Sequence, residues 1–100
     1  MKNVEQLLAQ AAELAGDGRH FQAERAYKGV IRLLAKTEPT SERLAEACLQ
    51  LERVYNELAG KIESRRNDYL DAANAAYQRA MAVRESKNVT SSAACSLGGA

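Results

Sequence analysis

Apolar residues recur at spacings of three and four along most of this chain, and that periodicity constrains its fold more than any other feature. The first two periodic stretches, residues 3–16 and 19–36, are separated by Gly16-Asp17-Gly18. Such a segment is typical of a helix end, because glycine readily adopts the left-handed conformation. A connection this short predicts that the two helices pack antiparallel as a hairpin.

A third helix is predicted after Pro39, the only proline, which disfavours helix at the residue before it. Thr40 or Ser41 can cap its start. Apolar residues then keep helical spacing to at least residue 59, and Gly60 either ends this helix or lies within it.

The fourth helix is predicted to begin at Asn67 or Asp68, either of which can cap it, and to end at about residue 86. The remaining residues are small and polar without periodicity, which predicts disorder. The expected organisation is all-α, with a hairpin at 3–36 and a hairpin at 41–86 inside one helical domain at 1–87, followed by a disordered tail at 88–100.

The charge balance argues against two classes of partner. The sequence has 14 basic and 13 acidic residues, a formal net charge of +1, so it shows no electrostatic footprint for nucleic acid or an anionic membrane. The N-terminal stretch is interrupted by Glu5 and Glu13 and resembles neither a secretory signal nor a membrane span. We therefore expect a cytoplasmic protein without nucleic-acid or membrane partners.

No arrangement of residues is typical of catalysis, which needs a nucleophile or base held by partner groups. His20, the only histidine, stands beside a turn and is expected to be structural, and Cys48 lies on an apolar stripe and is expected in the core. Cys48 and Cys95 form neither a disulfide framework nor a zinc pattern. We expect no enzyme activity, no cofactor and no metal.

A short pattern occurs in both hairpins: Ala23 precedes Tyr27 by four residues, and Ala73 precedes Tyr77 by the same distance. With Gly18 at the turn, the first hairpin resembles one tetratricopeptide repeat, in the variety seen in kinesin light chains. The resemblance implies that the alanine allows the two helices to cross closely and that the tyrosine fills the next core position.

The second hairpin resembles the same family through Leu51, Tyr55 and the ending AYQRAMAVRE at 76–85. An alternative resemblance is to the three-helix microtubule-interacting-and-transport domain, through RRNDYLDAA at 65–73. The spacing to the similar segment near residue 20 is too long for that family, so we favour the tetratricopeptide one.

The resemblance implies a short α-solenoid of two stacked hairpins that acts as a non-catalytic protein–protein interaction module. In the family, a peptide or helical segment of the partner lies against the first helix of each repeat. The branch that holds acidic chaperone C-termini is not expected, because Leu8 and Ala12 replace the Lys and Asn it needs. The implied partner-binding positions are Glu5, Leu8, Ala12, Ala15, Glu46, Leu49, Arg53 and Asn56.

A second class of function is left open, because two repeats are fewer than the three that usually form a stable stack. Another copy of the chain could cover an open face. An alanine-rich face formed by Ala72, Ala76, Ala80 and Val83 would allow close helix approach. The alternative is therefore a structural, homo-oligomerising helical bundle, with a homodimer as its simplest form.

Overall fold

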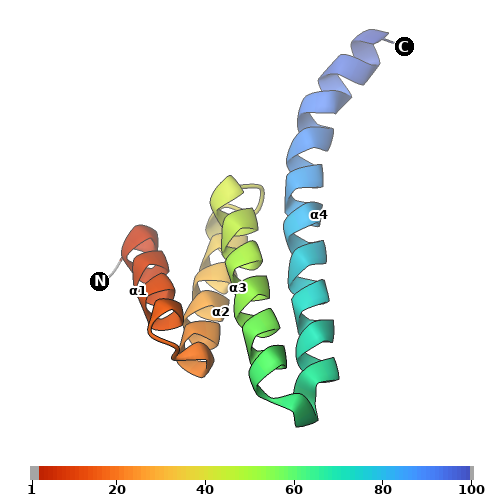
Figure 1. Cartoon of the computed structure of the whole chain (residues 1–100). Coiled ribbons are helices and arrows are strands. Elements are labelled where there is room, and N and C mark those ends of the chain that lie inside the picture. The colour runs from red at the N-terminus through yellow and green to blue at the C-terminus, as the bar shows by residue number, and fades with distance from the viewer. Residues whose placement is uncertain (1–2, 100) are drawn as a thin grey trace.

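Residues 3–99 fold into four α-helices and contain no β-strand (Figure 1). The structure is a computed structural model that describes these residues, and side chains for residues 3–86. The all-α prediction is confirmed. The elements are α1 (Val4–Gly16), α2 (His20–Thr37), α3 (Glu42–Lys61), the 3-10 turn η1 (Glu63–Arg65) and α4 (Arg66–Gly99).

The helices form an open row in which each one packs antiparallel against the next (Figure 1). α1 also touches α3, whereas α4, within the described part of the chain, approaches neither α1 nor α2. A closed up-and-down four-helix bundle would bring its first and last helices together. Here α3 is instead the central element, with α2 on one side and α4 on the other.

Local signals in the sequence fix the starts of α1 and α3 and the first turn. The Asn3 side chain accepts a hydrogen bond from the Gln6 backbone N–H at 2.8 Å, and the Gln6 side chain accepts one from the Asn3 backbone N–H at 3.1 Å. Ser41 caps α3 by accepting from the Arg43 backbone N–H at 3.0 Å. Gly18 has a φ of 82°, which glycine adopts without strain, and so allows the turn into α2.

The boundary between α3 and α4 differs in part from what the sequence predicts, which leaves open whether Gly60 ends the third helix. Gly60 lies inside α3, and the helix breaks at Ile62, where φ is −119° and ψ is 85°. The Ile62 side chain is partly buried and packs against the core. Asn67 and Asp68 are not caps, because the turn η1 leads directly into α4 and both residues already lie within that helix.

The backbone of α4 is helical through Gly99 and extends past the ends of the other helices (Figure 1). The sequence predicts a helix end near residue 86, and the helical backbone continues past it. The disordered tail predicted at 88–100 stays a prediction. Between Gly60 and Gly98 the sequence contains no glycine or proline, so neither of the two strongest helix breakers interrupts it. The side chain of Cys95 lies outside those described.

The repeated Ala-to-Tyr pattern is only half reproduced in the packing. Ala23 and Tyr27 are both buried in the first hairpin, and Ala73 is buried in the second. Tyr77, however, is 40% exposed. Tyr69 is buried instead, and its ring stacks on a tyrosine of α3 with 6.2 Å between the ring centroids. The two hairpins therefore share the small residue but not the aromatic one.

Candidate functional site

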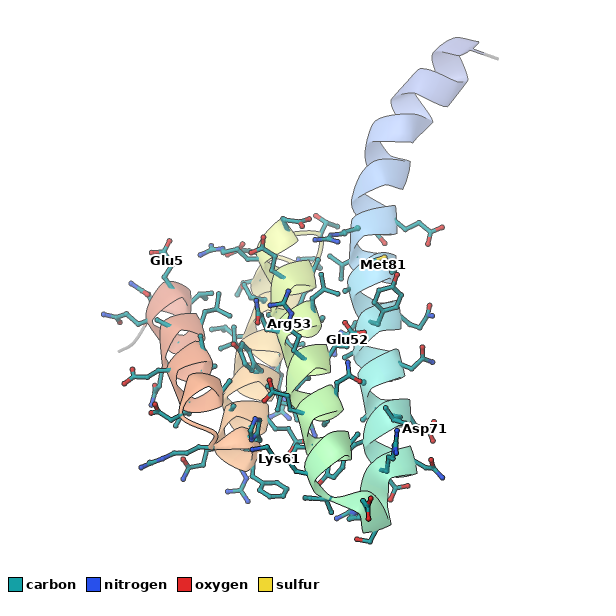
Figure 2. The ribbon with its side chains drawn as sticks, viewed as in Figure 1. Glu5, Glu52, Arg53, Lys61, Asp71 and Met81 are labelled. Atoms are coloured by element: carbon teal, nitrogen blue, oxygen red, sulfur yellow. The ribbon has the colours of Figure 1, made fainter. Side chains whose placement is uncertain are left out.

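The surface implied by the resemblance lies along α1 and α3, and its polar members are exposed. Figure 2 shows Glu5 near the N-terminal end of α1 and Arg53 about halfway along α3. The Glu5 carboxylate lies 3.9 Å from the guanidinium of Arg43, so α1 and α3 are linked at one end of this surface. The predicted positions that remain exposed are Glu5, Ala12, Glu46, Arg53 and Asn56.

The two leucines of that surface are placed differently. Leu8 and Leu49 are half-buried and pack against the hydrophobic core. Much of their apolar area is therefore used inside the fold, and the part of this face left for a partner is mainly polar. Replacing both leucines with glutamate would disturb packing as well as binding. A double variant of this kind would therefore not distinguish an adaptor from a structural oligomer.

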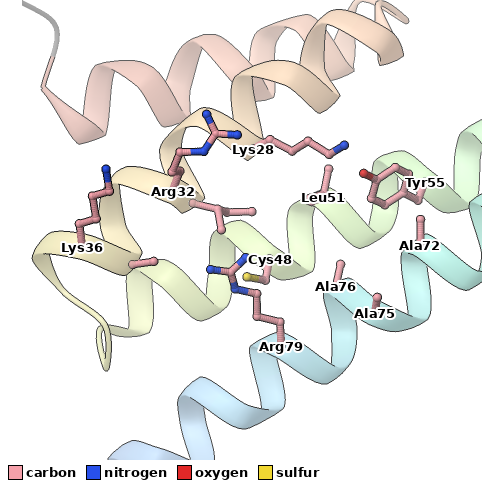
Figure 3. A pocket seen from close by; sticks show the side chains of 12 residues that line it. Lys28, Arg32, Lys36, Cys48, Leu51, Tyr55, Ala72, Ala75, Ala76 and Arg79 are labelled. Atoms are coloured by element: carbon pink, nitrogen blue, oxygen red, sulfur yellow. The ribbon is translucent and has the colours of Figure 1, made fainter.

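A second surface, which the sequence analysis did not identify, lies on another side of α3. Cys48, Leu51 and Tyr55 face it at spacings of three and four, which place them on one helix face. Arg53 is displaced from Cys48 by roughly 140° around the helix, so the two surfaces are distinct. Because α2 and α4 flank α3 without approaching each other, a groove of about 690 Å³ lies between the three helices (Figure 3).

The side chains along the rim of this groove are positively charged. Lys28, Arg32 and Lys36 follow one another every four residues along α2, so they form one line, and Arg79 stands opposite on α4 (Figure 3). No acidic residue lines the groove. We call this site the basic groove, defined by these four cations and by the floor residues Cys48, Leu51 and Tyr55.

The four cations differ in how they are held. The Lys28 ammonium lies 3.3 Å from the Glu24 carboxylate, and its hydrogen bond with Tyr55 is the main cause that raises the pKa of Lys28. No described residue forms an ion pair with Arg32, Lys36 or Arg79. Three of the four charges are therefore available to a ligand.

Long basic side chains cover the apolar floor. Arg79 extends from α4 toward Cys48 (Figure 3), and the Lys28 ammonium lies 5.9 Å from the centroid of the Tyr55 ring. Such side chains shield apolar surface with their aliphatic stems while the charged heads stay in water. The opposite wall is formed by Ala72, Ala75 and Ala76, whose small side chains keep the groove wide.

Burial determines the chemistry of the thiol in this groove. Desolvation raises the pKa of Cys48 above its ordinary value of 9.0, while the positive charge of Arg79 acts in the opposite direction. The thiol is therefore protonated at neutral pH, and a protonated thiol is a poor nucleophile. The site offers apolar contact and positive charge.

His20 lies outside both surfaces. It is buried, and its Nε2 is in hydrogen-bond contact with Oε2 of Glu57. A carboxylate accepts, so the ring nitrogen donates, and the contact joins the start of α2 to the last turns of α3. Among the described residues no three His, Cys, Asp or Glu side chains are grouped so that they could hold a metal. In the same part of the chain, none of the helices has the length and hydropathy needed to cross a bilayer.

Part of the signal for the basic groove is present in the sequence. The basic residues of α2 recur every four positions, and Ala72 and Ala76 belong to the face predicted to allow close helix approach. No local pattern, however, predicts that α2 and α4 flank α3 with these two rows facing one groove.

In comparisons with known proteins, no family model, curated protein or solved structure matches the chain.

Proposed function

We propose that this protein is a non-catalytic protein–protein interaction module, an adaptor of tetratricopeptide-like organisation that holds a peptide or helical segment of a partner. The basic groove carries the proposal. It is a concave space of about 690 Å³ with an apolar floor and a polar rim, bounded by three helices. Sites that recognise peptides and helices commonly combine these features.

The arrangement of the helices supports the proposed organisation. Successive antiparallel helices pack in a row, and α1 and α3, the first helices of the two hairpins, also touch. Tetratricopeptide-like hairpins use a small residue where their helices cross, and Ala23 is a small residue with no exposed surface, as that position would require. An open row also leaves more than one face for partners, whereas a closed bundle buries its apolar faces internally.

A specific observation favours the alternative function, a structural homo-oligomer. Leu70 and Tyr77 are 41% and 40% exposed on α4. They are seven residues apart and therefore lie on the same side of the helix. Large apolar side chains aligned in this way suit the packing of α4 against α4 of a second copy.

The solution mass separates the two functions. We would measure it by size-exclusion chromatography with light scattering over a roughly tenfold concentration range, because self-association depends on protomer concentration. A constant mass near 10.9 kDa would support the adaptor. A doubled mass that returns to the monomer value in a Leu70→Gln, Tyr77→Gln variant would support the structural alternative.

A matched pair of variants tests whether the basic groove is the interaction site. Ala75 is exposed and lines the groove, whereas Ala82 is exposed on the same helix outside it. We expect immobilised Ala75→Trp protein to lose partners that wild type and Ala82→Trp both retain, because the indole would fill the groove. Identical sets of bound proteins on all three baits would contradict the proposal.

A further inference from the structure

We infer that the basic groove receives an acidic amphipathic helix from a partner protein. This inference rests on the proposed function and specifies the chemistry of the partner. Two independent properties of the groove lead to it: the sign of its charges and the spacing of its floor.

The charge of the groove is more one-sided than that of the chain. The whole sequence is nearly balanced, at +1, yet the rim carries four basic residues and no acidic one. Arg32, Lys36 and Arg79 make no ion pair within the described residues. Carboxylates on a bound segment would supply the missing counter-charges from both sides, and charge complementarity of this kind sets the specificity and register of binding.

The spacing of the groove matches an α-helix. The floor residues on α3 span about 10 Å, from Cys48 to Tyr55, which is roughly two helical turns. Lys28, Arg32 and Lys36 repeat every four residues along one edge, so they match acidic residues that repeat every three or four positions on a neighbouring helix. The alanines on α4 would let the backbone of the bound helix approach closely.

Binding would change the position of the side chains that now cover the floor. Arg79 extends across toward Cys48, and its guanidinium would turn to the rim to pair with a carboxylate (Figure 3). That movement would expose the floor to leucine or a similar side chain of the partner. The ion pairs and the apolar contact are therefore coupled, and a helix lacking either acids or apolar residues would bind weakly.

The test uses the full chain and a fluorescein-labelled synthetic helix of about four turns. The probe carries leucine at i, i+3 and i+7 and glutamate on both flanks. Two comparison probes replace every glutamate with glutamine or with lysine. Binding is followed by fluorescence anisotropy, at low salt and at high salt.

We expect the glutamate probe to bind more tightly than the other two and to weaken as salt rises, because salt screens exposed charge pairs. The variant Arg32→Gln, Lys36→Gln, Arg79→Gln should weaken binding by roughly tenfold, from three ion pairs of ordinary strength. The control variant Arg25→Gln, Lys61→Gln, Arg66→Gln removes the same number of charges from exposed positions outside the groove. It should bind the probe as wild type does.

Three results would overturn the inference. Equal weakening by both triple variants would mean that the probe responds to net charge. If the glutamine or lysine probe bound more tightly and Ala75→Trp still blocked it, the partner would not be acidic. The groove would then still be a protein-binding site, in agreement with the proposed function. The protein could also bind phosphatidylserine vesicles but not the glutamate probe. If that binding depended on the same three cations, the groove would be a site for a membrane surface.

Discussion

The first hairpin buries two alanines completely, one on each of its helices. Ala11 on α1 and Ala23 on α2 both have 0% exposure. We expect Ala23→Leu to lower the free energy of unfolding by about 1–3 kcal/mol, because extra methylenes in a packed core force neighbouring groups to move. Gln22→Leu, at the exposed neighbouring position, should change it by less than about 0.5 kcal/mol. Urea unfolding measures both, and equal effects would show that the core around Ala23 has room for leucine.

Cys48 should make stability sensitive to alkaline pH. Burial raises the thiol pKa in the folded state above the ordinary value of 9.0, so above that pH the unfolded chain loses a proton that the folded chain keeps. The contribution of the buried thiol to the free energy of unfolding is therefore fully present below pH 9. It is lost as pH rises toward the folded-state pKa.

Comparison with Cys48→Ala isolates this effect, because Cys95 and the tyrosines are present in both proteins. We expect the wild type to be the more stable protein at neutral pH and its advantage to shrink above pH 9. Chemical denaturation at several pH values would measure the two free energies. A constant difference across the range would mean that folding does not change the pKa of Cys48.

Among the helices, the sequence predicted best those boundaries that depend on neighbouring residues. The cap at Ser41 and the turn at Gly18 depend on residues within a few positions, and both are present in the structure. The break at Ile62 depends on packing against the core. Contacts of that kind are not encoded by nearby residues, which is why the sequence leaves open whether Gly60 ends the helix.

Burial was predicted less well than helix position. Phe21 and Leu33 of α2 are 53% and 38% exposed, because each lies roughly 120° around the helix from the buried Tyr27. An apolar residue at the edge of a helix face is buried only if a neighbouring helix reaches it, and that depends on how the helices cross. Tyr77 is exposed for the same reason, although the repeat pattern predicts it in the core.

The contact between His20 and Glu57 links two helices, and we expect it to contribute modestly to stability. Glu57→Ala would remove the acceptor of a buried ring nitrogen, at a cost of about 1 kcal/mol, because Glu57 itself is largely exposed and water can partly replace it. Glu85→Ala is the control, since Glu85 is exposed on α4 and far along the chain from both His20 and Glu57. Thermal or urea unfolding that gives equal stability for both variants would show that the contact contributes nothing.

The central place of α3 explains both the fold and the candidate site of the whole molecule. It packs between α2 and α4, so the helices share one hydrophobic core, and the same separation of α2 from α4 forms the basic groove. The sequence supplies the basic row on α2 and the alanines on α4. Their meeting across α3 is a consequence of long-range packing, which is why the groove became apparent only in the structure.

That central place also predicts how the molecule unfolds. Leu58 of α3 is almost fully buried in the shared core, so Leu58→Ala should lower the free energy of unfolding by about 2–5 kcal/mol. Because α3 contacts every other helix, the loss should be felt by all four together. Residue-resolved NMR during urea titration should give amides of α1 and of α4 the same midpoint, in the wild type and in the variant. If α3 and α4 unfolded first while α1 and α2 stayed folded, the two hairpins would be separate cooperative units, and the core would not couple them.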